Sequence, residues 1–289
     1  MTNVLIVLLA CVAACSAQTL PTPTPEQLHY MDSELTMFIH FSVCTFNDGC
    51  DGGQQNCGYD GRNQPYPAST FNPLGLDTDQ WAQTAADMGA KQACLTTHHS
   101  GGFALWPTNA SSYSIEASPF GATGRDIVRE FVNSMRKQSI EPCFYIVRES
   151  RVAGSLGVVI GLPPVTCAVN MDCAEANNTI DRYYDIQAQM LTELLTEYGP
   201  IPRMWWDMVS HPEGSWGRFA HSLCPLPPQC QVSSTFAQPW NPGGFPELFK
   251  NLSAHAKALA PETLLLPGTD GCLVGGETGS GSYPVFYCE

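Results

Sequence analysis

The chain has 289 residues, with 13 Lys plus Arg against 27 Asp plus Glu, which gives a formal net charge of -14. This charge argues against a nucleic acid partner, because a polyanion would be repelled, and it favours a neutral ligand such as a glycan. The length suffices for one large domain, since a barrel of alternating strands and helices needs about 250 residues.

The N-terminus predicts export from the cell. Residues 4–14 form an apolar run that is followed by the small residues Cys15-Ser16-Ala17, a pattern typical of a signal peptide. We expect residues 1–17 to be removed, which leaves residues 18–289 as the catalytic domain in an extracellular or lysosome-like compartment, with no membrane attachment after cleavage. A retained membrane anchor is the alternative, although the run is short for a bilayer.

Cysteine and asparagine patterns agree with an oxidising compartment. Of the 13 cysteines, Cys11 and Cys15 lie in the expected signal peptide, so 13 - 2 = 11 remain, and one thiol is left unpaired. We expect most of the others to form disulfides. The paired Cys-x-x-Cys spacing of a zinc site is missing, so no metal is expected. Candidates for disulfides are Cys44, Cys50 and Cys57 in one loop, Cys167 with Cys173, and Cys224 with Cys230, and the glycosylation sequons are at Asn109, Asn177 and Asn251.

The first half of the chain alternates strands with helices. An apolar run predicts a buried strand over residues 35–41. Apolar residues at helical spacing predict a helix over 80–88, which the polar residues 77–79 introduce and Gly89 ends. A second strand is expected over 93–97. A helix over 125–138 follows, with Ile127, Val128, Phe131, Val132 and Met135 on its buried face.

The second half continues the alternation. Strands are expected over 142–147, 203–206, 231–234 and 263–266, and helices over 181–198 and 247–259. This order predicts a parallel sheet. Because no Gly-rich phosphate loop follows the first strand, we expect a TIM-like (β/α)8 barrel rather than a dinucleotide fold. Six strands are counted where a full barrel has eight, so the barrel is expected to be incomplete at the C-terminus. The oligomeric state is not predicted.

Polar residues follow several of the predicted strands. His40, the pair His98 and His99, and Asp207 all stand at carboxyl ends, where barrel enzymes place their working residues. Packing alone explains this distribution poorly. Each residue taken singly has a structural alternative, a hydrogen-bonding histidine or a helix-capping aspartate. Adjacent histidines in an extended chain point to opposite faces, which argues against a shared metal.

Several phrases resemble the α-L-fucosidases of glycoside hydrolase family 29. The family phrase F-I-H-W-G is matched by F-I-H-F-S at residues 38–42, and F-N-P by residues 71–73. D-x-x-Q-W is matched at residues 77–81. The long phrase G-A-K-Y-A-x-L-T-x-K-H-H-D-G-F-x-L-W is similar to residues 89–106, and W-x-D corresponds to residues 205–207. The resemblance covers roughly residues 30 to 289.

The resemblance implies roles for individual residues. Asp207 would be the nucleophile of a retaining mechanism, and Glu277, in a phrase similar to G-P-D-x-R-W-V-G-N-E, would be the general acid and base. A retaining site places two such carboxyl groups about 5–5.5 Å apart. Sugar-contacting positions would be His40, His98, His99, Tyr145, Trp106 and Trp205.

Three features depart from the family pattern. Ser100-Gly101-Gly102 replaces the family's Asp-Gly after the paired histidines, which lengthens the loop by one residue. Near the end, Cys272, Leu273 and Gly276 replace Arg, Trp and Asn. The chain also ends soon after residue 286, where relatives usually continue through further strands and often a β-sandwich, so a truncated catalytic domain without the C-terminal β-sandwich is expected.

The sequence therefore predicts a hydrolase that releases terminal α-L-fucose from glycans or glycoproteins with retention of configuration, and without a cofactor. Two alternatives stay open at this point. The altered loops are compatible with a secreted protein that binds fucose but is catalytically impaired. A secreted glycoprotein held together by disulfides, with no sugar site, is the other alternative.

Overall fold

The structure of the protein is a computed structural model. It describes residues 23–47, 66–99, 101–148, 180–208 and 245–266. Glu277, the expected strand over 231–234 and the expected signal peptide lie outside these residues.

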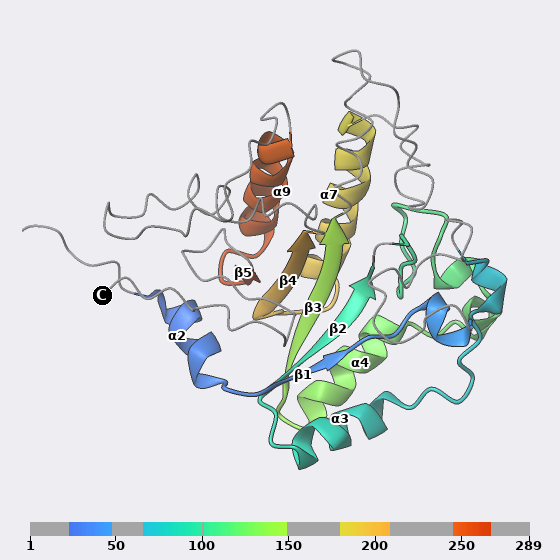
Figure 1. The fold of residues 1–289 in the computed structure, drawn as a ribbon, viewed down its shortest axis with the longest axis horizontal. Helices are drawn as coiled ribbons and strands as arrows, with labels where there is room; N and C mark the ends of the chain where they lie inside the picture. The colour runs from blue at the N-terminus through green and yellow to red at the C-terminus, as the bar shows by residue number, and fades with distance from the viewer. Residues whose placement is uncertain (1–22, 48–65, 100, 149–179, 209–244, 267–289) are drawn as a thin grey trace, which may run out of the picture.

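A five-stranded parallel sheet forms the centre of the described chain (Figure 1). Its strands follow the order of the sequence, and every neighbouring pair is parallel. The prediction of a parallel α/β sheet is thereby confirmed. The strands are β1 (Thr36–Ile39), β2 (Gln92–His98), β3 (Glu141–Arg148), β4 (Arg203–Met208) and β5 (Leu264–Leu266).

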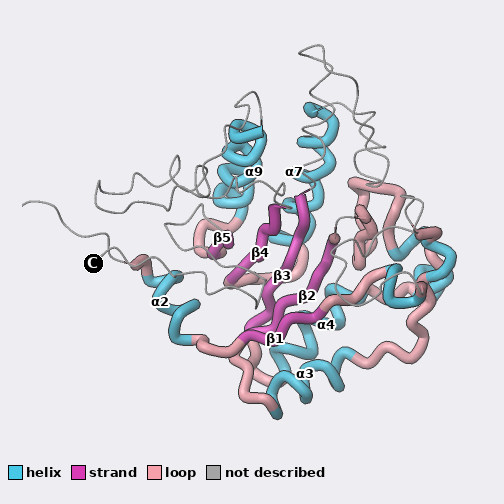
Figure 2. The backbone as a smooth tube through the Cα atoms, in the orientation of Figure 1, coloured by secondary structure: helices cyan, strands magenta, loops and turns pink. Residues whose placement is uncertain are grey.

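Four long helices alternate with the strands, as the periodicity predicts. They pack in two pairs, α3 against α4 and α7 against α9 (Figures 1 and 2). Asp77 and Asp126 cap α3 and α4 by accepting hydrogen bonds from backbone N–H groups three residues ahead. The bounds are α3 (Thr78–Asp87), α4 (Ile127–Lys137), α7 (Ile180–Thr196) and α9 (Phe245–Leu259). No helix in the described part of the chain is both long and apolar enough to cross a membrane.

All four helices cover the same face of the sheet. Alternate strand residues on this face join the buried side chains of the helices in one hydrophobic core. The expected apolar stripes of α4 and α7 lie in that core. Strand residues of this helix-covered face include Ile39, Leu95, Phe144, Met204, Trp206 and Leu265.

The opposite face of the sheet is concave. Phe38 of β1 and Trp205 of β4 are separated by three strand spacings, about 14 Å in a flat sheet, yet their ring centroids lie 5.7 Å apart. The guanidinium of Arg203 also crosses from β4 to β1, where it donates to Thr36 Oγ1 at 3.1 Å. The sheet is therefore curled, and its open face is the inner one.

A short helix that the sequence analysis missed closes the amino end of this concave face. α2 (Pro25–Asp32) begins with a capping box in which the Thr24 side chain and Gln27 satisfy each other's backbone N–H groups. Its Tyr30 ring lies 4.7 Å from the guanidinium carbon of Arg203. The T-x-x-Q spacing before an amphipathic segment was the available signal.

A disulfide joins Cys94 of β2 to Cys143 of β3, which are direct partners in the register of the two strands. Both sulfurs lie on the concave face and are buried. This bond was not among the expected pairs, because the cysteines stand 49 residues apart and meet only through strand pairing. Cys44 is a free, buried thiol. The other cysteines of the expected pairs lie outside the described residues.

Candidate active site

The carboxyl ends of four strands bring most of the expected site residues to one edge of the sheet. His40 directly follows β1, and Tyr145 lies in β3 opposite Trp205 of β4. His98 ends β2, and His99 follows it. These positions come from segments that are far apart in the sequence, and the parallel register aligns them.

A β-bulge in β2 decides which face of the sheet each of the two adjacent histidines takes. Thr96 pairs with Tyr145 and His98 pairs with Ile146, so Thr97 is an extra residue in β2. The Thr97 hydroxyl donates to the Tyr145 carbonyl at 2.9 Å. His98 therefore aligns with the helix-covered face and is fully buried. The opposite orientation of the two histidines, expected from extended backbone, leaves His99 on the concave face.

Five rings form a cluster on the concave face. The His99 ring stacks on Tyr145 at a centroid distance of 5.6 Å and an interplanar angle of 11°. His40 lies 5.3 Å from His99 and 4.9 Å from Phe38. Phe38 also meets the edges of Tyr145 and Trp205. This ring cluster, defined as Phe38, His40, His99, Tyr145 and Trp205, combines polar imidazoles with apolar aromatic faces.

The ring cluster keeps its histidines neutral. Burial lowers the pKa of His99 to about 3, and the nearby charges of His40 and His98 lower it further in the same direction. His40 keeps an exposed side, but partial desolvation lowers its pKa as well. A neutral imidazole has one N–H donor and one acceptor nitrogen, so each ring can pair with a ligand hydroxyl in either direction.

We expect His99 to make stability depend on pH. Its folded pKa of about 3 lies below its ordinary value of 6.5, so its contribution is full above pH 6.5 and is lost as the pH falls toward 3. After discounting for the exposed part of the ring, the loss at pH 5 should be on the order of 1 kcal/mol. Denaturant unfolding of the protein and of the His99→Gln variant, each at pH 7 and pH 5, checks this prediction. The free energy of unfolding of the variant should fall less between the two pH values. Equal losses in both proteins would contradict it.

A cavity of about 100 Å³ lies beside the two histidines. Cys44 lines this cavity with a buried thiol. Burial raises the pKa of the thiol to about 11, so the sulfur stays protonated. The Thr96 hydroxyl accepts a hydrogen bond from the Phe41 backbone N–H at 3.1 Å and fixes the turn after β1. The lining residues are His40, Phe41, Ser42, Cys44, Thr45, Thr96 and His99.

Sequence reasoning missed Phe38 and Thr96. The available signal was the alternation of side chains along a strand. Phe38 stands two residues before His40, and side chains two apart in a strand face the same side. No such count leads to Thr96, because the extra residue Thr97 breaks the alternation between Thr96 and His98. The altered phase at Thr97 could not have been read in this way.

Trp106 is not part of the ring cluster. Its side chain is fully buried, and its indole N–H donates to Glu193 Oε2 at 2.8 Å. An indole enclosed in this way offers no face to a sugar in the described arrangement. The expected sugar contact of Trp106 is therefore not part of the proposed site.

The structure describes the backbone of one of the two expected carboxylates, Asp207. Asp207 is the penultimate residue of β4 and pairs with Val147 at the carboxyl edge of the sheet. Its backbone thus stands two residues beyond Trp205, near the ring cluster, while its side chain lies outside the description. Glu277 lies outside the described residues altogether.

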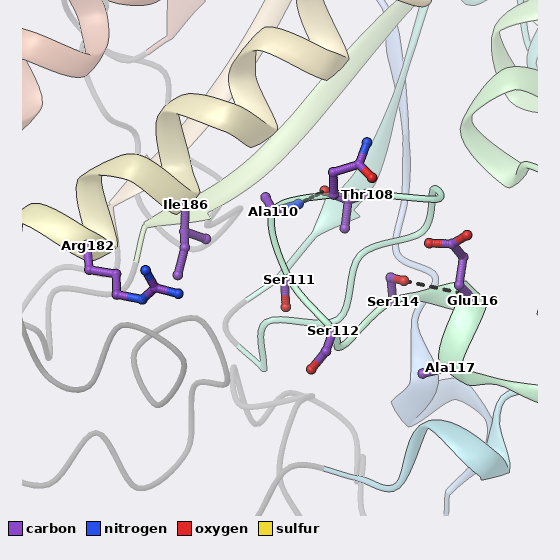
Figure 3. Close-up of a pocket in the computed structure, with 10 residues that line it drawn as sticks. Thr108, Ala110, Ser111, Ser112, Ser114, Glu116, Ala117, Arg182 and Ile186 are labelled. Atoms are coloured by element: carbon purple, nitrogen blue, oxygen red, sulfur yellow. Dashed lines mark hydrogen bonds between the residues drawn. The ribbon is translucent and has the colours of Figure 1, made fainter.

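A larger hollow, of about 640 Å³, lies between the N-terminal part of α7 and the segment over residues 108–117 (Figure 3). Arg182 and Ile186 extend from α7 toward the segment that carries Ser111 and Ser112. None of the residues expected to work in the site lines it. Among the described residues, no group of three or more His, Cys, Asp or Glu side chains is placed to hold a metal ion.

A comparison with protein families identifies the family of this chain. The family described as Alpha-L-fucosidase matches residues 16–235, more than half of the chain. The chain belongs to the alpha-L-fucosidase family. Alpha-L-fucosidase 1 of Arabidopsis thaliana is 29% identical over 188 residues, 65% of this chain and 31% of that protein. The chain thus matches about a third of the length of this curated relative.

Solved structures share the fold of this chain. A glycoside hydrolase 29 family member from an unknown rumen bacterium matches with a TM-score of 0.56 and 23% identity, over 86% of this chain and 36% of that one. The unliganded alpha-L-fucosidase of Lactobacillus casei matches with a TM-score of 0.56 and 15% identity, over 84% and 69% of the two chains. These likenesses support the arrangement of the strands and helices in this chain.

Proposed function

We propose that the protein is a retaining glycoside hydrolase that releases terminal α-L-fucose from glycans or glycoproteins. The observation that carries this proposal is the ring cluster on the concave face, at the carboxyl edge where β4 brings Asp207. Membership of the alpha-L-fucosidase family narrows the substrate class. The fold that we propose is the (β/α)8 barrel, and the curl of the sheet supports it.

In the proposed site the ring cluster binds the sugar. The neutral His40 and His99 rings donate to or accept from the fucose hydroxyls, and their low pKa keeps both roles available. Phe38 and Trp205 present apolar rings that suit the C–H faces of a deoxy sugar. His98 lies behind the bulge, so its proposed part is to orient His99 rather than to touch the substrate.

Two carboxyl groups carry the proposed chemistry. Asp207 attacks the anomeric carbon through an oxocarbenium-like transition state, and Glu277 donates a proton to the departing glycosidic oxygen. Glu277 then takes a proton from the water that attacks the fucosyl ester of Asp207. Fucose is released with its original configuration, and both carboxyl groups return to their starting states.

We further propose that the protein works outside the cytosol, in an extracellular or lysosome-like compartment, after loss of residues 1–17. The disulfide between Cys94 and Cys143 supports an oxidising environment. Asn109 and Asn251, the two proposed glycosylation sites within the described residues, are both exposed.

Turnover of 4-nitrophenyl α-L-fucoside by the purified chain tests the function. We expect release of nitrophenol, with α-L-fucose as the first sugar seen by proton NMR before mutarotation. The matched control substrate is 4-nitrophenyl α-L-rhamnoside, another deoxy sugar with different hydroxyl orientations, which should react far more slowly. First formation of β-L-fucose would contradict retention. Calorimetric binding of fucose without nitrophenol release would indicate a binding protein instead.

A further inference from the structure

A buried carboxylate on α7 holds the segment that follows the paired histidines. Glu193 is 2% exposed. Its Oε2 accepts from Trp106 Nε1 at 2.8 Å and from Thr108 Oγ1 at 2.6 Å. Its Oε1 accepts from the backbone N–H of Asn109 at 3.0 Å and from Gln189 Nε2 at 3.1 Å. Three of these four donors belong to residues 106–109, so the carboxylate ties that segment to the helix.

The same segment closes the bulge in β2. The backbone N–H of Leu105, next to Trp106, donates to the carbonyl of the extra residue Thr97 at 3.0 Å. Ala104 forms a bridge with His98 and continues the pairing to Ser114. The chain therefore folds back along the end of β2, and its return is fixed at Thr97 on one side and at Glu193 on the other.

This arrangement connects Glu193 to His99. The bulge at Thr97 decides which face each histidine takes, and the returning segment supplies the Leu105 hydrogen bond that occupies the Thr97 carbonyl. The Gly102 N–H also donates to the His99 carbonyl at 2.8 Å. We propose that Glu193 is a positioning residue that, through residues 102–109, fixes the β2 bulge and holds the His99 ring against Tyr145.

The inference rests on the proposed function only for its catalytic consequence. If His99 contacts the sugar, a misplaced ring should lower kcat/KM for a fucoside on the order of 10- to 100-fold. The geometric consequence is independent of activity. A ring stacked on Tyr145 has its proton resonances displaced by the tyrosine ring current, and the Leu105 amide is protected from hydrogen exchange.

Glu193→Gln is the informative variant. It preserves the size of the side chain but replaces one acceptor oxygen with an amide NH₂, which opposes one of the donors that face it. We expect displaced His99 ring resonances, assigned by their loss in His99→Gln, and faster exchange at Leu105. The matched control is Thr192→Val on the same helix, because the Thr192 hydroxyl contacts Ala188 O and His255 Nε2 instead of residues 106–109.

A second variant covers the case in which Glu193→Gln does not fold. Thr108→Val is nearly isosteric and removes one donor to the carboxylate, so it should produce a smaller change of the same kind. In the unmodified protein, the Trp106 indole N–H should exchange slowly. Fast exchange there, or unchanged His99 resonances in a folded Glu193→Gln protein, would overturn the proposal. A network that behaves as expected in a protein without fucoside turnover would refute the proposed function and leave this inference standing.

Discussion

Asp207→Asn should abolish fucoside hydrolysis while leaving the fold intact. The substitution retains size and shape but removes the charge and the nucleophilic oxygen, so the covalent step has no attacking group. We expect kcat/KM to fall by about 10⁴-fold or more. The measurement is initial-rate turnover of 4-nitrophenyl α-L-fucoside, with circular dichroism to verify folding.

The control for this variant is Asp185→Asn, the same chemical change at an exposed position of α7. It should retain nearly full activity. A second test replaces the missing nucleophile from outside. Asp207→Gly with added azide should recover turnover and yield a fucosyl azide, because a small anion can occupy the space of the carboxylate. An Asp207→Asn protein that retains a tenth of the activity would remove Asp207 from the mechanism.

Adjacent tryptophans on β4 should respond in opposite ways to truncation. Trp206 belongs to the helix-covered core and is 1% exposed, so Trp206→Ala should lower the free energy of unfolding by about 3–5 kcal/mol. Trp205 lies on the concave face against Phe38 and is only partly buried. Trp205→Ala should affect stability less and raise KM for a fucoside roughly tenfold, as expected for the loss of an aromatic contact.

Denaturant unfolding and steady-state kinetics on both variants check this contrast, and each variant serves as the control of the other. The physical reason is the alternation of side chains in a strand, which sends neighbours to opposite faces of the sheet. If Trp205→Ala proved as destabilising as Trp206→Ala with an unchanged KM, the concave face would be part of the packed core and not a binding surface.

Local patterns in the sequence were sufficient for most of the elements. The apolar stripe of α7 predicted its buried face, and Asp77 marked the start of α3. Gly89 and Gly199 have positive φ angles of 80° and 75° where the chain turns after α3 and α7. These features depend on residues three or four apart, so they can be read without knowledge of the fold.

The carboxyl-edge positions of His40, His98, His99 and Asp207 were also predictable. A parallel sheet places the ends of all its strands at one edge, so a residue after an apolar run can be assigned to that edge from the sequence. The family phrases around residues 38–42 and 89–106 then indicated a fucosidase, and the match to residues 16–235 confirmed the family.

Only the tertiary structure decided which histidine joins His40. The bulge at Thr97 depends on hydrogen bonds from Thr97 to Tyr145 and from Leu105 back to Thr97, and one extra residue reverses the alternation. The buried Trp106 indole likewise finds its hydrogen-bond acceptor on Glu193, which is 87 residues away in the sequence. Sequence periodicity shows which residues are neighbours along one element, whereas these contacts join different elements. The apolar pattern therefore determines the strands, and only the packing of the elements determines the site.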